Sequence, residues 1–393
     1  MTDSLITITP TTRSKGFKSK NVRFTARNSD DYIVANDIAA ALKTIKGNLY
    51  ATKDYKLLKI IRNSYDRFLS NQPLEPDDFI LAGHEILEYQ NVDKCHHLRY
   101  LIYRYKYNKY PELKIVDDFP PCLQIEPTSV CNYRCVMCYQ SDQNFVKKSG
   151  GFMGNMTYKI FVDIIDEVTG KIEAITLASR GEPLLHTKII PMLEYCRGKF
   201  LALKLNTNAS ILDEPIINAL LSSDLQTLVF SIDAADKQSY EKIRVGGKFD
   251  KILRNIELFR EIRERDYPDS KTLVRISGVK INDKQDIEQM EKFWGQFSDV
   301  VAFTNYNPWQ TAYRNPENSI KSACTEFWRR MFIWWDGKAN PCDYDYKSTL
   351  SKWQFGRQSV SDIWTSEEYN DYREVHLNGM RANIEPCRRC VLI

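Results

Sequence analysis

Three closely spaced cysteines are the residues of this chain best suited to chemistry. Cys131, Cys135 and Cys138 follow one another as C-x3-C-x2-C, directly after a short strand-like run. Three thiolates are one too few to close a tetrahedral metal site, so zinc would need a fourth ligand. A four-iron cluster held by three cysteines instead keeps one iron open for a ligand that is not protein. Three unrelated cysteines would rarely fall so close together, and the spacing therefore favours an iron–sulfur cluster.

Four further cysteines lie near the C-terminal end of the sequence. Cys324, Cys342, Cys387 and Cys390 have the spacing C-x17-C-x44-C-x2-C, and the Asp-Gly pair at 336–337 is a hairpin signal between the first two. A hairpin with a cysteine at each base, together with a distant C-x2-C pair, can surround one metal centre. Four thiolates fill either a zinc site or all four irons of a cluster.

A repeating strand–helix rhythm must position the first set of cysteines. Strands alternating with helices pair in parallel with right-handed crossovers, and six such units suit a partial α/β barrel. Because the chemistry of such barrels sits on the loops after the strands, the cysteine loop after the first strand lies where a site is expected. The predicted strands are 122–126, 174–178, 202–205, 227–232, 273–279 and 300–304.

The fold class predicted is α/β: a partial (β/α)6 TIM-like barrel with an N-terminal helical region and a small C-terminal cysteine-rich α+β domain. Apolar residues at helical spacing predict the helices before the barrel, and the strand–helix rhythm stops after Pro308. The predicted parts are a flexible arm at 1–20, a helical domain at 21–118, the barrel at 119–308 and the cysteine-rich domain at 309–393.

The loop at 131–138 resembles the cluster-binding loop of the radical S-adenosylmethionine (radical SAM) enzymes. The resemblance implies that S-adenosyl-L-methionine (AdoMet) chelates the open iron of a [4Fe-4S] cluster. One electron from the reduced cluster then cleaves AdoMet to a 5′-deoxyadenosyl radical, which abstracts hydrogen from substrate. The cofactor supplies the hard chemistry, while the protein supplies position and shielding.

Later elements of the barrel resemble the AdoMet-binding elements of the same family. Gly181 and Glu182 lie in a Gly-Glu-Pro turn after the second strand, and the resemblance implies that this turn contacts the methionine amine. The family often has two glycines here, whereas this chain has Arg180 in the first place. Asn206 lies in an element similar to the family's Thr-Asn pair after the third strand.

Three more residues are implied in AdoMet binding by the resemblance. Ser231, in a Ser-Ile-Asp element, would contact the ribose or carboxylate of AdoMet. Arg244 would pair with the carboxylate, since a guanidinium suits a carboxylate by bidentate geometry. The backbone of Met137, just before the third cysteine, would hold the adenine.

The cysteine-rich tail resembles the twitch domain, a shortened form of the SPASM domain that follows some radical SAM barrels. The resemblance implies one auxiliary [4Fe-4S] cluster on Cys324, Cys342, Cys387 and Cys390, and thus two clusters in the chain. A closed cluster cannot chelate substrate, so its expected role is electron transfer. The single closed cluster is most similar to members that oxidise a secondary alcohol of an aminocyclitol.

The resemblance implies a radical SAM oxidoreductase acting on a small polar molecule such as a sugar or aminocyclitol, with flavodoxin or ferredoxin as electron donor. The alternative is a maturase of a ribosomal peptide or a protein, with the helical region binding the peptide. A nucleic-acid-modifying enzyme is weaker, since it rests on the basic, tyrosine-rich stretch 94–114. A non-catalytic iron–sulfur or zinc protein is disfavoured by the retained AdoMet elements.

Bulk properties agree with an ordinary globular protein. The chain has 393 residues, a formal net charge of +4 and 27% charged residues. No uninterrupted apolar run approaches the length of a membrane span, and no signal peptide is evident. Ten cysteines without a secretion signal indicate reduced thiols or metal ligands, so the expected location is cytoplasmic, with no membrane partner.

Overall fold

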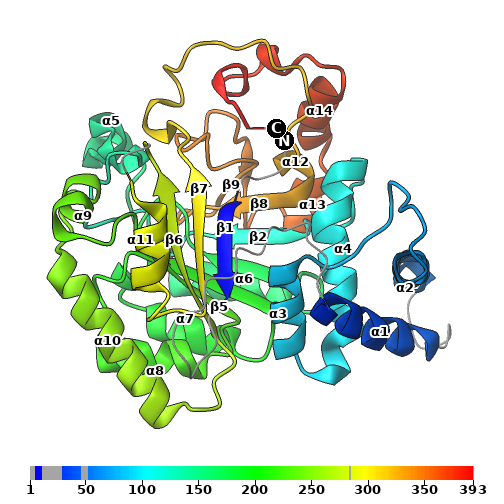
Figure 1. Ribbon diagram of the computed structural model, residues 1–393. Helices are drawn as coiled ribbons and strands as arrows, with labels where there is room; N and C mark the ends of the chain where they lie inside the picture. The colour runs from blue at the N-terminus through cyan, green and yellow to red at the C-terminus, as the bar shows by residue number, and fades with distance from the viewer. Residues whose placement is uncertain (1–4, 11–28, 46–51, 283–284, 393) are drawn as a thin grey trace.

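The computed structural model describes residues 5–10, 29–45, 52–282 and 285–392. Within these residues, ten strands form one sheet in the order β1-β7-β6-β5-β4-β3-β2-β8-β9-β10. The strands from β7 to β8 in this order pair in parallel, while β1, β9 and β10 pair antiparallel with their neighbours. The α/β class is confirmed (Figure 1).

The six predicted barrel strands are all present and lie in chain order across the sheet. Successive residues of each strand point alternately to a face that packs on helices and to a face that is turned inward. Parallel neighbours place all their C-terminal ends at one edge. These strands are β2 (Cys122–Ile125), β3 (Ala174–Leu177), β4 (Ala202–Thr207), β5 (Thr227–Ser231), β6 (Leu273–Lys280) and β7 (Val300–Asn305).

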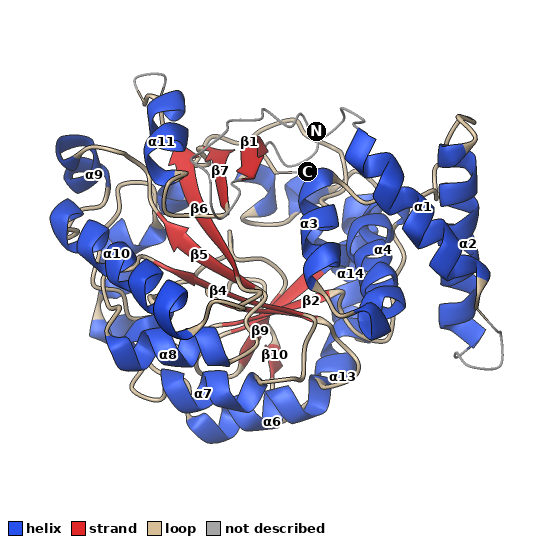
Figure 2. Cartoon of the chain, turned by 60° about the horizontal axis from the view of Figure 1, so that its bottom comes forward, coloured by secondary structure: helices blue, strands red, loops and turns tan. Residues whose placement is uncertain are grey.

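Helices cover the outer side of the curved sheet, as Figure 2 shows for α6, α7, α8 and α10. The start of α6 is fixed by Thr157, whose hydroxyl caps the N–H of Ile160, and its apolar stripe is buried against the strands. None of the described helices is long and apolar enough to cross a bilayer. The helices of this layer are α6 (Tyr158–Val168), α7 (Ile189–Cys196), α8 (Glu214–Ser222), α10 (Phe249–Asp266) and α11 (Ile287–Trp294), with the short α5 (Gln143–Val146) and α9 (Lys237–Ile243) in the loops.

The N-terminal helices close the end of the barrel opposite to the cysteine loop. Their shared apolar core also includes Cys122, Ala174 and Ala202, which are the first residues of β2, β3 and β4. Since the strands are parallel, these first residues mark the edge of the sheet away from the cysteine loop. The helices are α1 (Ser29–Lys43), α2 (Thr52–Leu69), α3 (Gly83–Asn91) and α4 (His97–Leu113).

The cysteine-rich tail continues the sheet of the barrel. β8 (Arg330–Ile333) pairs in parallel with β2, and β9 (Lys338–Asn340) returns beside it through the predicted Asp-Gly turn, where Gly337 has a φ of +83°. A glycine reaches this conformation without a steric penalty. The remaining elements are β10 (Trp353–Gln354), α12 (Glu326–Arg329), α13 (Val360–Thr365) and α14 (Glu367–Leu377).

Part of the stretch predicted as a flexible arm at 1–20 is instead a strand. β1 (Leu5–Pro10) pairs antiparallel with β7 and forms the edge of the sheet. Its threonines and isoleucines have high strand propensity, and the edge of β7 offers unpaired backbone groups. The remaining residues of the predicted arm lie outside the described part of the chain.

We expect the N-terminal helices to depend on a packed core. Ile61, in α2, is fully buried, whereas Ile33, in α1, is 62% exposed. Ile61→Ala should lower the free energy of unfolding by about 2–5 kcal/mol, because it leaves a cavity. The matched change Ile33→Ala should cost far less. Urea unfolding followed by circular dichroism measures both, and equal losses would contradict this packing.

Candidate functional site

The cysteine loop lies at the C-terminal ends of the strands and is bonded to the segment that carries Arg244. The N–H of Arg134 donates to the carbonyl of Val245 at 2.8 Å, and the N–H of Val136 donates to that of Ile243 at 3.0 Å. These two backbone bonds set the loop and the end of α9 side by side. Direct main-chain hydrogen bonds therefore place Arg244 beside the cysteine loop, where the carboxylate of AdoMet is expected.

The thiols of Cys131, Cys135 and Cys138 (the loop cysteines) lie close together and mostly out of solvent. Burial raises the pKa of all three, that of Cys131 to about 12, and the charge of Cys135 raises the pKa of Cys131 and of Cys138 further. Backbone N–H groups point at two of the sulfurs, from Tyr133 to Cys131 at 3.4 Å and from Gln140 to Cys138 at 3.5 Å. Such donors stabilise a bound thiolate.

Arg244 is held between a thiol and a carboxylate. Its Nη1 lies 4.0 Å from Cys135 Sγ, and its Nε lies 2.7 Å from Asp233 Oδ2. Burial opposes the charge of Arg244, but Asp233 and Cys135 together raise its pKa above the usual value. The other oxygen of Asp233 accepts the N–H of Val279 at 2.7 Å, which fixes the pair to β6. The sequence alone assigns Asp233 no role, because its partner lies on another segment.

Gly181 lies tightly against the strand end that leads into the cysteine loop. A Cβ at this position would meet the carbonyl oxygen of Thr128 at 2.2 Å and that of Val130 at 2.6 Å. Any side chain larger than hydrogen would therefore push the two loops apart. The close approach required at the Gly-Glu-Pro turn is present at Gly181, although Arg180 takes the place of the family's other glycine.

The carboxylate of Glu182 is fully engaged by protein donors. It accepts the N–H of Leu184 at 3.1 Å, the hydroxyl of Thr207 at 2.7 Å and the N–H of Asn208 at 2.7 Å. Burial raises its pKa, while these donors act in the opposite direction. Glu182 thus ties the loop after β3 to the end of β4, and its position next to Gly181 fixes the shape of the turn.

Asn206 and Ser231 lie at the ends of β4 and β5, on the inward face of the sheet. The Oδ1 atom of Asn206 is buried and has no hydrogen-bond partner within the described part of the chain. Such an acceptor suits a ligand that brings a donor. Met137 is half-buried in the cysteine loop and packs against the barrel core. The structure thus gathers the predicted AdoMet residues around one end of the barrel.

Arg180 links the barrel to the tail. Its guanidinium forms a bidentate pair with the buried Glu126, at 2.7 Å from Nε and 2.6 Å from Nη2, and donates from Nη1 to the carbonyl of Tyr346 at 2.9 Å. It also stacks 4.2 Å from the ring centre of Trp334. Sequence reasoning missed Glu126, which directly follows β2 and accepts the N–H of Trp335 as well, at 3.3 Å.

The side chain of Arg381 lies among three of the four cysteines Cys324, Cys342, Cys387 and Cys390 (the tail cysteines), and it influences Cys324, Cys387 and Cys390. This arginine is 1% exposed and donates to the carbonyls of Cys387 at 3.3 Å and Cys390 at 2.9 Å. Burial raises the pKa of all four thiols, and Cys342 is influenced by the charges of the other three. The arrangement gathers the four sulfurs, although they come from segments up to 66 residues apart in sequence.

Aromatic side chains fill the space between the loop cysteines and the tail cysteines. Tyr139 stacks on Tyr346 with ring centres 5.1 Å apart and lies 6.0 Å from Trp309, which lies 6.3 Å from Tyr344. We call these four residues the aromatic bridge. The cluster that contains them also includes Cys138 from the loop and Cys342 and Cys390 from the tail. Both sets of cysteines therefore contact one continuous aromatic layer.

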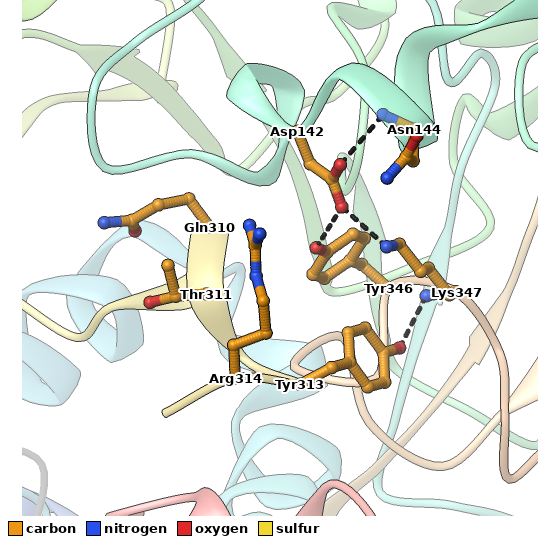
Figure 3. Close-up of a pocket in the computed structure, with 8 residues that line it drawn as sticks. All are labelled: Asp142, Asn144, Gln310, Thr311, Tyr313, Arg314, Tyr346 and Lys347. Carbon is orange, nitrogen blue, oxygen red and sulfur yellow. Dashed lines mark hydrogen bonds and ion pairs between the residues drawn. The ribbon is translucent and has the colours of Figure 1, made fainter. Parts of the chain in front are cut away.

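A small polar cavity of about 110 Å³ opens beside the aromatic bridge, where the segment after the cysteine loop meets the tail (Figure 3). Asp142 accepts the hydroxyl of Tyr346 at 2.7 Å and the ammonium of Lys347 at 2.6 Å. The hydroxyl of Tyr313 accepts the N–H of Lys347 at 2.8 Å. These hydrogen bonds and the ion pair connect the segment after the cysteine loop to the tail.

Family comparisons agree with the two sets of cysteines. The profile of the radical SAM superfamily matches residues 125–293, and that of the SPASM iron–sulfur cluster-binding domain matches residues 324–391. The chain is therefore a radical SAM enzyme with a SPASM domain. It uses AdoMet and [4Fe-4S] clusters, one that binds AdoMet and one auxiliary.

Individual relatives are distant. The tungsten-containing aldehyde ferredoxin oxidoreductase cofactor-modifying protein of Pyrococcus furiosus is 23% identical over 317 residues, covering 67% of this chain and 86% of the relative. SuiB of Streptococcus suis bound to S-adenosylmethionine has 16% identity and a TM-score of 0.53, covering 76% of this chain and 79% of SuiB. BtrN in complex with AdoMet and 2-DOIA has 17% identity and a TM-score of 0.48, covering 71% and 95%. The likeness to SuiB shows the fold alone.

The donor sets fit these cofactors. Among the described residues, no three His, Cys, Asp or Glu side chains form a group that could hold a single metal ion. A four-iron cluster does not require its ligands to meet at one metal ion, because each thiolate binds a different iron. The buried, unpaired Oδ1 of Asn206 and the Arg244–Asp233 pair beside Cys135 supply polar groups where AdoMet is expected.

Anaerobic iron and sulfide counting tests the two sets directly. The intact chain should bind about eight irons, as expected for two four-iron clusters. The double variant Cys387→Ala/Cys390→Ala should retain about four, whereas Cys95→Ala, at an exposed cysteine, should retain all eight. A full count in the double variant would remove these residues from the ligand set.

Replacement of Arg180 should destabilise the junction of barrel and tail. Arg180→Ala leaves the carboxylate of Glu126 buried without its partner, so the expected loss is about 3–5 kcal/mol of unfolding free energy. Arg357 is exposed, and Arg357→Ala should change stability little. Chemical denaturation of both variants measures the difference, and an Arg180→Ala protein as stable as Arg357→Ala would mean that the pair does not support the junction.

Proposed function

We propose that this chain is a radical SAM oxidoreductase that oxidises a small polar molecule of the sugar or aminocyclitol type. When bound, AdoMet and the two clusters supply a 5′-deoxyadenosyl radical for hydrogen abstraction and a one-electron acceptor for the substrate radical. The observation that carries the proposal is the aromatic bridge, because it joins Cys138 to Cys342 and Cys390 through packed side chains.

The proposed ligands of the AdoMet-binding cluster are the loop cysteines, and those of the auxiliary cluster are the tail cysteines. The division of the chain into a helical domain at 21–118, a barrel at 119–308 and a tail at 309–393 is part of the same proposal. The residues proposed to bind AdoMet, directly or through the shape of their loops, are Met137, Gly181, Glu182, Asn206, Ser231 and Arg244.

The residues of the chain have three tasks in this reaction. Arg244 is held by Asp233 so that its guanidinium stays beside Cys135, where it can receive a carboxylate. Gly181 lets the turn after β3 approach the cysteine loop. The aromatic bridge excludes water between the two sets of cysteines, which limits the energy lost to solvent reorganisation when an electron moves.

The overall balance of the proposed reaction is simple. Oxidation of a secondary alcohol to a ketone removes one hydrogen atom, one proton and one electron from the substrate. The hydrogen atom ends in 5′-deoxyadenosine, and AdoMet cleavage itself consumes one electron. We propose a small donor such as flavodoxin or ferredoxin for that electron, and a reducing, cytoplasmic setting.

Two observations favour a small molecule over the other candidate substrates. The helices α1–α4 pack on the first residues of β2, β3 and β4, at the end away from the cysteine loop, which argues against their presenting a peptide to the loop. In the basic stretch 94–114, Tyr100, Tyr103, Tyr105 and Tyr110 are buried in the helical core, so they are not available to stack on bases. A peptide maturase remains the alternative proposal.

The proposal is tested by anaerobic turnover of the reduced, reconstituted enzyme with a panel of sugars and aminocyclitols. The substrate should yield 5′-deoxyadenosine and oxidised product in equal amounts. Cys138→Ala should abolish AdoMet cleavage, whereas Cys390→Ala should still cleave AdoMet but lose the oxidised product. Cys95→Ala serves as the control, since this cysteine is exposed and belongs to neither set. Methyl transfer to the substrate or regeneration of AdoMet would contradict the proposal.

A further inference from the structure

The inward face of the barrel strands is polar and positively charged. The outward residues Leu203 and Val274 are at most 1% exposed and pack against the helices. The alternate positions on the same strands, Lys204 on β4 and Arg275 on β6, therefore point to the inside of the barrel. Branched apolar side chains usually fill such an interior, so two cations in mid-strand need an explanation.

These inward side chains retain accessible surface although they lie in the middle of the sheet. Thr176, Lys204, Asn206, Arg275 and Ser277 are each only partly buried. Helices cover the outer face, so the accessible surface of these side chains belongs to the inner side of the barrel (Figure 2). There is therefore room for at least a water-sized molecule beside the two cations.

Lys204 and Arg275 stand close to one another without an acidic partner. Neither forms an ion pair within the described part of the chain, and the Nε of Arg275 is buried without a hydrogen bond. Burial, followed by the positive charges of Arg275 and Arg330, lowers the pKa of Lys204 to about 8. Burial also lowers the pKa of Arg275. Two partly desolvated cations in one space oppose folding, which is a common mark of a binding site.

The neighbouring charges do not cancel the two cations. Arg330 is already paired with Glu326, its Nε lying 2.8 Å from Oε2. Glu88, from α3, acts on both Lys204 and Arg275, but it also accepts the hydroxyl of Tyr100 at 2.8 Å and lies 3.8 Å from Arg104. A net positive charge therefore remains on the inner face.

The register places Lys204 one inward position below Asn206, and Arg275 at the level of Asn206. Asn206 follows Lys204 by two residues on the same face, which is about 6.6 Å along the strand toward the cysteine loop. Arg275 is separated from β4 by β5, which places the two strands about 9.6 Å apart. Asn206 and Arg275 both pair with Val229 of β5, so they lie at the same level. Long cationic side chains from the two strands can reach one ligand over Val229.

We propose that the inner face of the barrel binds an oxyanion group of the substrate, a phosphate or a carboxylate, between Lys204 and Arg275. This inference rests on the proposed function and deepens it: among sugars and aminocyclitols it selects an anionic molecule over a cationic amine. The anion would hold the rest of the molecule above it, toward Asn206 and the cysteine loop.

The test uses the anaerobically prepared holoenzyme with inorganic phosphate and succinate as probes. Thermal unfolding is measured in each anion and in sodium chloride of equal ionic strength. A ligand that binds only the folded state raises the melting temperature, so phosphate or succinate should raise it beyond chloride. The anion with the larger effect identifies the class of group. Lys204→Gln and Arg275→Gln should each weaken its apparent affinity at least tenfold.

Matched variants separate a binding role from a structural one. In chloride, Lys204→Gln and Arg275→Gln should melt no lower than the wild-type chain, because each removes an unpaired, partly buried charge. Lys352→Gln and Arg357→Gln, at exposed positions, should leave the anion effect unchanged. Lys204→Arg should retain it, and this variant keeps the test decisive if a glutamine variant does not fold.

Three results would overturn the inference: neither anion stabilises the wild-type chain beyond chloride, the glutamine variants keep wild-type affinity, or they melt well below the surface controls in chloride. Iron content and AdoMet cleavage without substrate should be unchanged in the variants. If no oxidised product were found while the anion effect persisted, the proposed oxidation would fail and the anion site would stand.

Discussion

The buried pair of Arg180 and Glu126 is the interaction on which the two halves of the molecule depend. Glu126 directly follows β2, in the segment that leads into the cysteine loop, and Arg180 lies in the turn after β3. The same guanidinium reaches the carbonyl of Tyr346 and the ring of Trp334 in the tail. A charge this deeply buried is tolerable only with its partners in place, so the loop, the turn and the tail must assemble together. The glycine that the family often has at this position could not make these contacts.

Sequence reasoning was successful where the signal is local. The six barrel strands follow from short apolar runs separated by helical stretches, and the hairpin between β8 and β9 follows from its Asp-Gly turn. The spacing of the loop cysteines likewise depends only on a short stretch of chain. The Gly-Glu-Pro turn was found by its motif, and the tight approach of Gly181 to Thr128 explains why glycine is needed there.

Sequence reasoning missed residues whose roles depend on distant partners. Asp233, Glu126 and Arg381 carry ordinary side chains, and only the folded chain places them against Arg244, Arg180 and the tail cysteines. The inner cations were missed for the same reason, since Lys204 has no special sequence context. The N-terminal helices were predicted as helices, but their position at the strand starts follows from packing that no periodicity reveals.

The pairing of β8 with β2 has a consequence for the evolution of this architecture. Main-chain bonds fix the tail cysteines to the barrel: Ile125 lies opposite Ile333, and the N–H of Glu126 donates to the carbonyl of Ile333 at 2.9 Å. The span between the two cofactor sites is therefore set by the strand ladder and not by the length of the connection between β7 and α12. That connection also carries Trp309 of the aromatic bridge and the tail cysteine Cys324, so descendants could change its length and composition only where these two residues keep their places.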